Sequence, residues 1–168
     1  EFVEDPEYPD SLAVLQQSRP FIVLRTFSKI YGMAGLRVGY AIGREEPIAK
    51  LATRKLGSSV NILGAAAARA SLGKPAHVAS ERKLNSDARE FTRRLFDSLG
   101  YAVVPSHTNF MMVDIRRSSK EFQEACRKRD VLVGRPFPPL DTHARISIGT
   151  MDEMRRAAEV FKQVLANA

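Results

Sequence analysis

The segment between residues 21 and 43 constrains the fold most strongly, because it places a single lysine, Lys29, between two apolar runs. The first run, FIVL at residues 21–24, is rich in β-branched and apolar residues, which is typical of a strand buried on both faces of a parallel sheet. A second strand is expected at residues 37–42. A lysine between two such strands either reaches solvent or performs chemistry, because burial of an ammonium group costs several kcal/mol of hydration.

Helical patterns follow the second strand. Helices are expected over residues 45–55, with Pro47 in the first turn, and over residues 62–73, with Gly73 at the end. A longer helix is expected over residues 76–99, where apolar residues recur at intervals of three and four: Leu84, Ala88, Phe91, Leu95 and Leu99. Strands and helices alternate here as they do in an α/β layer.

The remaining residues have a different order of elements. Strands are expected at residues 101–104, 109–115, 131–133 and 144–149, and helices at residues 120–130 and from Met151 onward. Each of the two helix starts carries a capping box, in which a hydroxyl residue is followed three positions later by a glutamate: Ser118 with Glu121, and Thr150 with Glu153. This order indicates a small α+β domain after the α/β segment.

Composition limits the kinds of partner. The 168 residues are 44% apolar, which is enough to bury a core, and they carry a net charge of +7. The basic side chains are scattered, and neither a zinc-finger spacing nor an RNA-binding aromatic motif occurs, so we expect no nucleic-acid partner. No apolar run approaches the roughly 20 residues that a membrane-spanning helix needs, so we expect no membrane partner.

The cysteine and the histidines limit the redox and metal chemistry. A single cysteine, Cys126, excludes an internal disulfide and favours a reducing compartment, so we expect a cytoplasmic protein. Its helical spacing from Phe122 and Ala125 indicates a small core residue rather than a reactive thiol. The histidines are too widely spaced for a local metal motif, and we expect no metal site from them: His77, His107 and His143.

The residues around Lys29 meet the needs of covalent chemistry by an amine. The preceding strand delivers the lysine at its carboxyl end, where open α/β sheets place their ligands. Thr26 and Ser28 offer hydroxyls, and Arg37 offers a planar cation suited to phosphate oxygens. A ligand with both a carbonyl group and a phosphate fits this set. Pyridoxal phosphate is such a ligand, because its aldehyde bonds to lysine.

The segment RTFSKIYGMAGLRVGY, residues 25–40, resembles the cofactor-lysine signature of the fold type I, class I/II aminotransferases. It is most similar to the signature of the histidinol-phosphate aminotransferases. The resemblance implies that Lys29 binds the aldehyde of pyridoxal phosphate and transfers protons. It also implies that Thr26, Ser28 and Arg37 hold the cofactor phosphate.

A weaker resemblance extends through NILGAAAA, PSHTNFMMV and VLVGRPFPPLDTHARISIGT. It implies that Arg145 binds the substrate carboxylate and that Arg135 binds the substrate phosphate of histidinol-phosphate enzymes. The prolines of GRPFPPLDTH depart from the commoner family loop, so Phe137 and these prolines are alternatively an apolar rim for an aromatic substrate. The family's Asp-x-Ala-Tyr segment, which contacts the cofactor ring, is not in this sequence.

Together these patterns predict the C-terminal half of a pyridoxal-phosphate-dependent aminotransferase. Residues 1–75 are expected to end its large α/β cofactor domain, with a parallel-rich sheet, and residues 76–168 to form an interdomain helix and a small α+β domain. The resemblance implies amino-acid and 2-oxo-acid substrates, a homodimer when intact, and no transamination by this segment alone. Three alternatives stay open: a decarboxylase of the threonine-phosphate type, a non-catalytic basic module that binds nucleic acid or protein, and a gene relic without activity.

Overall fold

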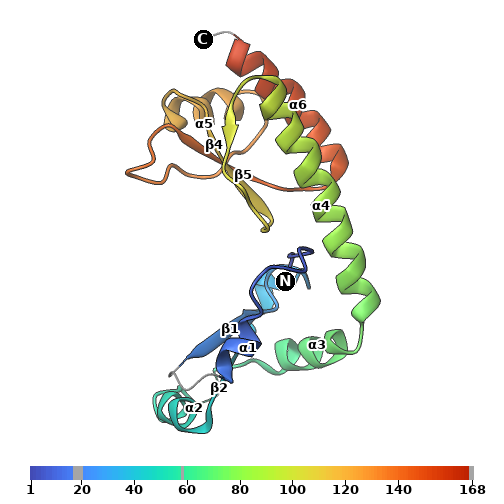
Figure 1. Ribbon diagram of the computed structural model, residues 1–168, viewed down its shortest axis with the longest axis vertical. Helices are drawn as coiled ribbons and strands as arrows, with labels where there is room; N and C mark the ends of the chain where they lie inside the picture. Colours follow the sequence, from blue (N-terminus) through green and yellow to red (C-terminus); the bar gives the residue numbers. More distant parts are fainter. Residues whose placement is uncertain (17–20, 58, 167–168) are drawn as a thin grey trace. The chain divides into compact units, whose positions relative to one another are not determined.

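The chain folds into two compact units in a computed structural model that describes residues 1–16, 21–57 and 59–166 (Figure 1). Asp5–Ala79 form the lysine unit, and Glu1–Glu4 together with Ser80–Ala168 form the arginine unit. Helix α4 (Pro75–Ser98) includes the boundary between the two units. The domain boundary expected after residue 75 stays a prediction.

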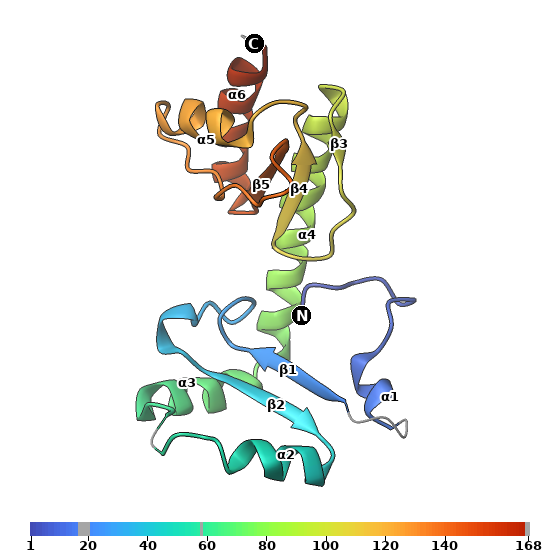
Figure 2. The ribbon, with the colours of Figure 1, turned by 90° about the vertical axis from the view of Figure 1, so that its left-hand side faces the viewer.

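The lysine unit is built around an antiparallel pair of strands (Figure 2). The pair joins β1 (Ile22–Thr26) to β2 (Gly39–Gly43), with Thr26 opposite Gly39. The other elements of this unit are α1 (Ser11–Leu15), the 3-10 helix η1 (Ala34–Leu36), α2 (Glu45–Ala52) and α3 (Ile62–Leu72). Both expected helices of this region are therefore present, although α2 ends three residues earlier than the sequence indicated.

The expectation of a parallel strand buried on both faces at residues 21–24 is wrong. The strand exists, but it pairs antiparallel with β2, because the chain returns through residues 27–38 without a crossover helix. Val23 is buried while Leu24 is 77% exposed, so the described residues cover one face of β1. The second strand is confirmed with a later start, since Arg37 has a φ of 54° and so lies outside the extended region.

The arginine unit is a three-stranded antiparallel sheet with helices on one face (Figure 1). The sheet order is β3-β4-β5, and the elements that follow α4 are β3 (Ala102–Val103), β4 (Phe110–Asp114), α5 (Ser119–Arg127), β5 (His143–Ser147) and α6 (Met151–Ala166). Strand residues alternate between faces. The side chains on the core face are almost fully buried against the three helices: Met111, Val113, Ala144 and Ile146.

The expected helices α4, α5 and α6 are confirmed, and α6 buries one apolar face against the core: Met154, Ala158, Phe161 and Leu165. The face expected of α4 is partly wrong. Leu84 is 60% exposed, while the polar side chains of Asn85 and Thr92 are buried. Thr92 fits there because its hydroxyl donates a hydrogen bond of 2.7 Å to the Ala88 carbonyl. An apolar pattern alone misses such a residue.

Residues 131–133 were expected to form a strand, and this expectation is wrong. Asp130 takes a left-handed conformation with φ 60°, and the amide of Val131 donates back to the Cys126 carbonyl, which closes the end of α5. The Gln123 side chain then donates to the carbonyls of Val133 and Gly134, so a side chain takes the place of a neighbouring strand. Leu132 is 85% exposed as a result.

Local chemistry agrees with the sequence at the two helix starts and at the cysteine. Ser118 caps α5 by accepting a hydrogen bond of 3.2 Å from the Glu121 amide. Thr150 and Glu153 form the full capping box, with the Thr150 amide donating to Oε2 at 2.7 Å and the Glu153 amide donating to Oγ1. Cys126 is fully buried in the core, and burial raises the pKa of its thiol to about 11, so the expected structural role is confirmed.

The described residues contain neither a candidate membrane span nor a candidate metal cluster. No helix within residues 1–16, 21–57 and 59–166 combines the length and the apolar composition needed to cross a membrane. Over the same ranges, no group of three or more His, Cys, Asp or Glu side chains is arranged to hold a metal ion.

The core of the arginine unit gives a first prediction. Phe161 is 1% exposed and its ring packs against those of Phe96 and Phe122, at 5.5 and 5.7 Å between centroids. We expect Phe161→Ala to lower the free energy of unfolding by about 3–5 kcal/mol, because it leaves a cavity in the core. Leu132→Ala is the matched control, and we expect it to cost less than about 0.5 kcal/mol because Leu132 is exposed. Urea unfolding followed by circular dichroism measures both, and equal losses would contradict the fold.

Candidate active site

Lys29 lies on a tight turn that follows the end of β1. The Gly32 amide donates a hydrogen bond of 2.8 Å to the Lys29 carbonyl, and Gly32 has a φ of 67°, which glycine adopts without steric cost. The neighbouring residues Phe27 and Ile30 are each only 3% exposed. The turn is therefore anchored on both sides of the lysine, while the Lys29 side chain itself is exposed.

Hydrogen bonds bring Thr26, Ser28 and Arg37 to the same end of the strand pair. The pairing of β1 with β2 continues one step past the strand, because the Phe27 amide donates to the Val38 carbonyl at 3.1 Å. Ser28 follows Phe27 and Arg37 precedes Val38, so both lie one residue beyond this last hydrogen bond of the strand pair. The Ser28 amide also donates to the Thr26 hydroxyl at 3.0 Å, which fixes the first bend of the turn.

Arg37 is held in an unusual backbone conformation. Its φ of 54° is left-handed and its ψ is 51°, a region that residues other than glycine occupy at a cost of roughly 1–2 kcal/mol. The guanidinium Nη1 donates a hydrogen bond of 2.7 Å to the Ala34 carbonyl, which ties the side chain to the 3-10 helix η1. Arg37 remains exposed, so its other N–H groups face solvent.

Asn61 and Gly64 support Arg37 from the start of α3. The Asn61 side chain donates to the Leu36 carbonyl at 2.8 Å and accepts from the Gly64 amide at 2.7 Å, so it caps α3 and anchors the residue before Arg37. A Cβ added to Gly64 would lie 2.5 Å from the Val38 side chain, so only glycine allows this approach. In the sequence, Asn61 stands out only as the first residue of the segment NILGAAAA. The signal available was an N-cap residue before an apolar helix.

The donors at this turn fit the chemistry of pyridoxal phosphate. The exposed Lys29 amine is accessible to an aldehyde, and the Arg37 guanidinium has N–H groups that can donate to phosphate oxygens. Within the described residues, the Ser28 hydroxyl has no hydrogen-bond partner and is available as a further donor. The Thr26 hydroxyl already accepts from the Ser28 amide.

Arg135 and Arg145 both belong to the arginine unit. Arg145 lies on β5, opposite Met112 of β4, on the face of the sheet that the helices leave uncovered. Its guanidinium carbon is 4.2 Å from the centre of the Phe110 ring, within cation–π range. Arg135 is exposed in the segment that connects α5 to β5.

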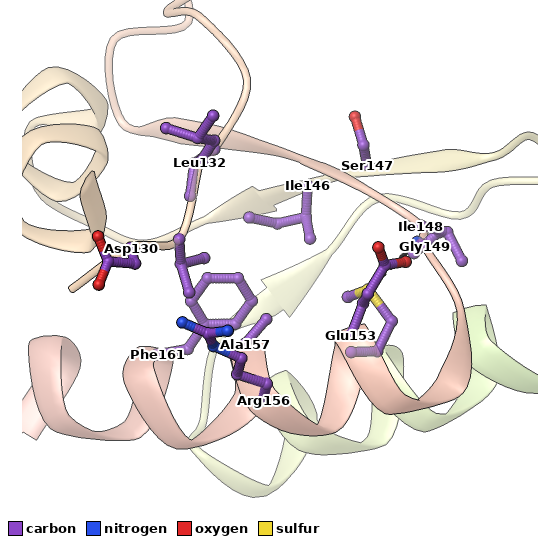
Figure 3. A pocket seen from close by; sticks show the side chains of 13 residues that line it. Asp130, Leu132, Ile146, Ser147, Ile148, Gly149, Glu153, Arg156, Ala157 and Phe161 are labelled. Carbon is purple, nitrogen blue, oxygen red and sulfur yellow. Dashed lines mark hydrogen bonds between the residues drawn. The ribbon is translucent and has the colours of Figure 1, made fainter.

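A pocket of about 390 Å³ lies on the other face of β5 (Figure 3). It opens between residues 130–133, the end of β5 and the start of α6, with Ile146 and Phe161 in its apolar floor. Ile146 and Arg145 are successive strand residues and point to opposite faces. None of the predicted site residues lines this pocket, so it does not belong to the candidate active site.

Comparison with known proteins defines the family. The family model of aminotransferase class I and II matches residues 1–161. This chain belongs to that family, so the resemblance is confirmed. The mixed α/β class inferred from the sequence is also confirmed, whereas the strand pairs within the described residues are antiparallel rather than parallel. The family uses pyridoxal phosphate as its cofactor.

The similar proteins include several histidinol-phosphate aminotransferases. The curated enzyme of that name from Moorella thermoacetica is 38% identical over 168 residues, which are 99% of this chain and 44% of the relative. A crystal structure from Erwinia carotovora atroseptica, provisionally named histidinol-phosphate aminotransferase, matches 96% of this chain and 47% of its own, with a TM-score of 0.90 at 34% identity. The Sinorhizobium meliloti enzyme, solved with pyridoxal phosphate, matches 87% of this chain and 41% of its own, with a TM-score of 0.75 at 28% identity.

The chain spans about half the length of the curated relatives that it matches. The match therefore covers nearly all of this chain but leaves more than half of each relative without a counterpart in it. The individual roles of Lys29 and its neighbours are not settled by these matches and stay predictions.

The support of Arg37 by Asn61 gives a second prediction. In Asn61→Ala we expect exchange of the Gly64 amide hydrogen to speed up about fivefold, because loss of an N-cap costs about 1 kcal/mol. Asn61→Asp is the matched control. It keeps the oxygen that accepts from Gly64 and loses the donor to Leu36, so the Gly64 amide should stay protected. Amide exchange by NMR measures both variants, and equal exchange in the two would contradict the described cap.

Proposed function

We propose that the protein containing this chain is a pyridoxal-phosphate-dependent aminotransferase of the histidinol-phosphate type. It would move an amino group between an amino compound that carries an anionic group and a 2-oxo acid. The proposal rests most on one observation, the exposed Lys29 amine on a turn that also holds the Ser28 hydroxyl and the Arg37 guanidinium at one end of the β1–β2 pair. The names of the similar proteins support the histidinol-phosphate type.

The cofactor residues have separate tasks in this proposal. Pyridoxal phosphate supplies an aldehyde that bonds to amines and a ring that withdraws electrons from the substrate's α-carbon. Thr26, Ser28 and Arg37 would hold the phosphate, with the guanidinium giving charge-assisted hydrogen bonds. The hydrogen bond from Arg37 to the Ala34 carbonyl would then keep the guanidinium in place before the phosphate binds.

Lys29 would act as the base that moves a proton. Its Nζ would hold the cofactor through the aldehyde and, as a free amine, would accept the proton from the substrate's α-carbon. The turn around Lys29 is anchored by Phe27 and Ile30, whereas the lysine side chain is exposed and has several rotatable bonds. Such an arrangement lets Nζ move while the backbone stays fixed.

Arg145 and Arg135 would bind the anionic groups of the substrate. In this proposal the Arg145 fork binds a carboxylate through two N–H groups, and Arg135 binds a substrate phosphate. Within the described residues neither side chain forms a hydrogen bond or an ion pair, so the N–H groups of both guanidiniums are available to a ligand. These two arginines would favour amino substrates that carry a carboxylate or a phosphate over uncharged amines.

The alternatives make different predictions. A threonine-phosphate decarboxylase would release carbon dioxide from its substrate, whereas a transaminase would not. A basic module would bind nucleic acid with a steep dependence on salt and would take up no cofactor. Membership in the aminotransferase family favours transamination over the basic module. A gene relic would show no amino transfer.

We further propose a homodimer for the whole protein and a cytoplasmic location. A lone buried thiol with a raised pKa fits a reducing compartment, in which disulfides do not form. We also propose that residues 1–75 end the large domain and that residues 76–168 form the interdomain helix and the small domain. Light scattering of the whole protein would test the dimer.

Lys29 gives the third prediction. When the protein is incubated with pyridoxal phosphate and reduced with borohydride, we expect a covalent label on the peptide that contains Lys29. Lys29→Ala should lose this label, because the side chain has no amine. Mass spectrometry of the digested protein identifies the labelled peptide, and assay of the whole protein should show amino transfer reduced at least a thousandfold in Lys29→Ala.

The control for this experiment is Lys55→Ala. Lys55 is an exposed lysine of the same unit that lies outside the predicted site. Its loss should leave both the Lys29 label and the amino transfer unchanged. Equal labelling of Lys29 and Lys55 in the original protein, or an unchanged label in Lys29→Ala, would contradict the proposed role.

A further inference from the structure

Arg37 has a backbone conformation that its neighbours must maintain. Its φ of 54° and ψ of 51° are left-handed, and in this region the Cβ atom of an L-residue is crowded by the following carbonyl oxygen. Glycine avoids this crowding, and the other left-handed residue of the same loop is Gly32, with φ 67°. A strained residue persists where the surrounding structure holds it. The contacts on either side of Arg37 therefore decide where its side chain lies.

Helix α3 holds the residue before Arg37 through Asn61. The Asn61 side-chain amide donates a hydrogen bond of 2.8 Å to the Leu36 carbonyl. This carbonyl belongs to the planar peptide group that joins Leu36 to Arg37, so the hydrogen bond restrains the rotation that sets φ of Arg37. The oxygen of the same side chain accepts from the Gly64 amide at 2.7 Å. Asn61 is therefore fixed at both of its polar atoms.

Helix α3 also holds the residue after Arg37. Val38 is 8% exposed and forms a buried cluster with Ala68 of α3. A Cβ added to Gly64 would lie 2.5 Å from the Val38 side chain and 3.0 Å from the Leu36 oxygen, so α3 closely approaches both residues at this point. Arg37 thus lies between two residues that each contact the start of α3.

The position of the Arg37 guanidinium depends on this restrained backbone. Its Nη1 donates a hydrogen bond of 2.7 Å to the Ala34 carbonyl, only three residues earlier in the chain. A change of φ at Arg37 turns the Cα–Cβ bond and moves the guanidinium away from this carbonyl. The hydrogen bond from Asn61 to Leu36 therefore acts on the guanidinium through the backbone.

We propose that Asn61 is a positioning residue for the cofactor phosphate. Asn61 holds the Leu36 carbonyl, which keeps Arg37 left-handed and its guanidinium ready to bind the phosphate. This inference rests on the proposed function, in which Arg37 binds that phosphate. It has a specific consequence: Asn61 raises the affinity for pyridoxal phosphate but not for pyridoxal, which has the same aldehyde and lacks the phosphate.

The test compares these two ligands in the longest polypeptide that carries this sequence. Asn61→Ser is the variant, because serine is also a good N-cap for the Gly64 amide but lacks the amide nitrogen that donates to Leu36. Borohydride trapping at increasing ligand concentration gives the concentration that labels half of Lys29. We expect this concentration to rise about tenfold for pyridoxal phosphate, as loss of one charge-assisted hydrogen bond predicts, and to stay unchanged for pyridoxal.

A double-mutant cycle separates positioning from a general loss of structure. Arg37→Gln should itself weaken the preference for pyridoxal phosphate, and adding Asn61→Ser to it should have much less effect than Asn61→Ser has in the original protein. Equal effects in the two backgrounds would contradict a role through Arg37. Ser71→Ala is the matched control. It removes a neutral side-chain hydrogen bond of 2.9 Å at the other end of α3, so it should leave the preference unchanged.

The restraint on the backbone has a test that needs no ligand. Arg37→Gly replaces the strained residue with one that adopts the left-handed conformation freely. Asn61→Ser should therefore lower the urea midpoint of unfolding less in Arg37→Gly than in the original protein. If Asn61→Ser alone does not fold, adding Arg37→Gly should restore folding. Equal shifts of the midpoint, or a double variant that stays unfolded, would overturn the inference.

Failure of this inference is distinguishable from failure of the proposed function. If Lys29 is labelled and the preference for pyridoxal phosphate is the same in Asn61→Ser as in the original protein, the inference alone is wrong. If neither ligand labels Lys29, the proposed function is wrong and the inference falls with it.

Discussion

The hydrogen bond from the Phe27 amide to the Val38 carbonyl is the interaction on which the lysine site depends. It continues the β1–β2 pairing past the end of both strands, and so it sets Ser28 beside Arg37, nine positions apart in the sequence. The same extension fixes the start of the turn that carries Lys29. Asn61 and Gly64 hold the returning chain from α3. Without this pairing, the amine, the hydroxyl and the guanidinium would be three separate surface groups.

In the arginine unit, the position of the candidate site residues depends on helices packing against only one face of the sheet. Helices α4, α5 and α6 bury one face of the three-stranded sheet, with Phe96, Phe122 and Phe161 in the core. Alternation along β5 then places Arg145 on the other face, where Phe110 and Phe137 contact it. Burial of the apolar residues thus determines which polar residues stay available for a ligand. The pocket beside Ile146 lies on the core side and is a separate feature.

The sequence predicted the parts of this structure that depend on local chemistry. Capping residues such as Thr150 and the periodic apolar residues of α4 are local signals, and they located the helices correctly. The sequence did not predict the features that depend on contacts between residues distant in the sequence. Whether Leu24 is buried depends on which residues pack against β1. Residues 131–133 do not form a strand, and the Gln123 side chain donates a hydrogen bond to the Val133 carbonyl. The cofactor motif predicted Lys29 and Arg37, but no local pattern could reveal that Asn61 anchors Leu36 or that Phe137 contacts two arginines.

The central claim is that Lys29 and its neighbours form a binding site for pyridoxal phosphate. A crystal structure of the longest polypeptide that carries this sequence, grown with pyridoxal phosphate, tests it most directly. The account predicts electron density continuous from Lys29 Nζ to the cofactor, with the phosphate contacting Ser28 and Arg37. Cofactor bound at another lysine, or a phosphate with no contact to Arg37, would contradict the claim.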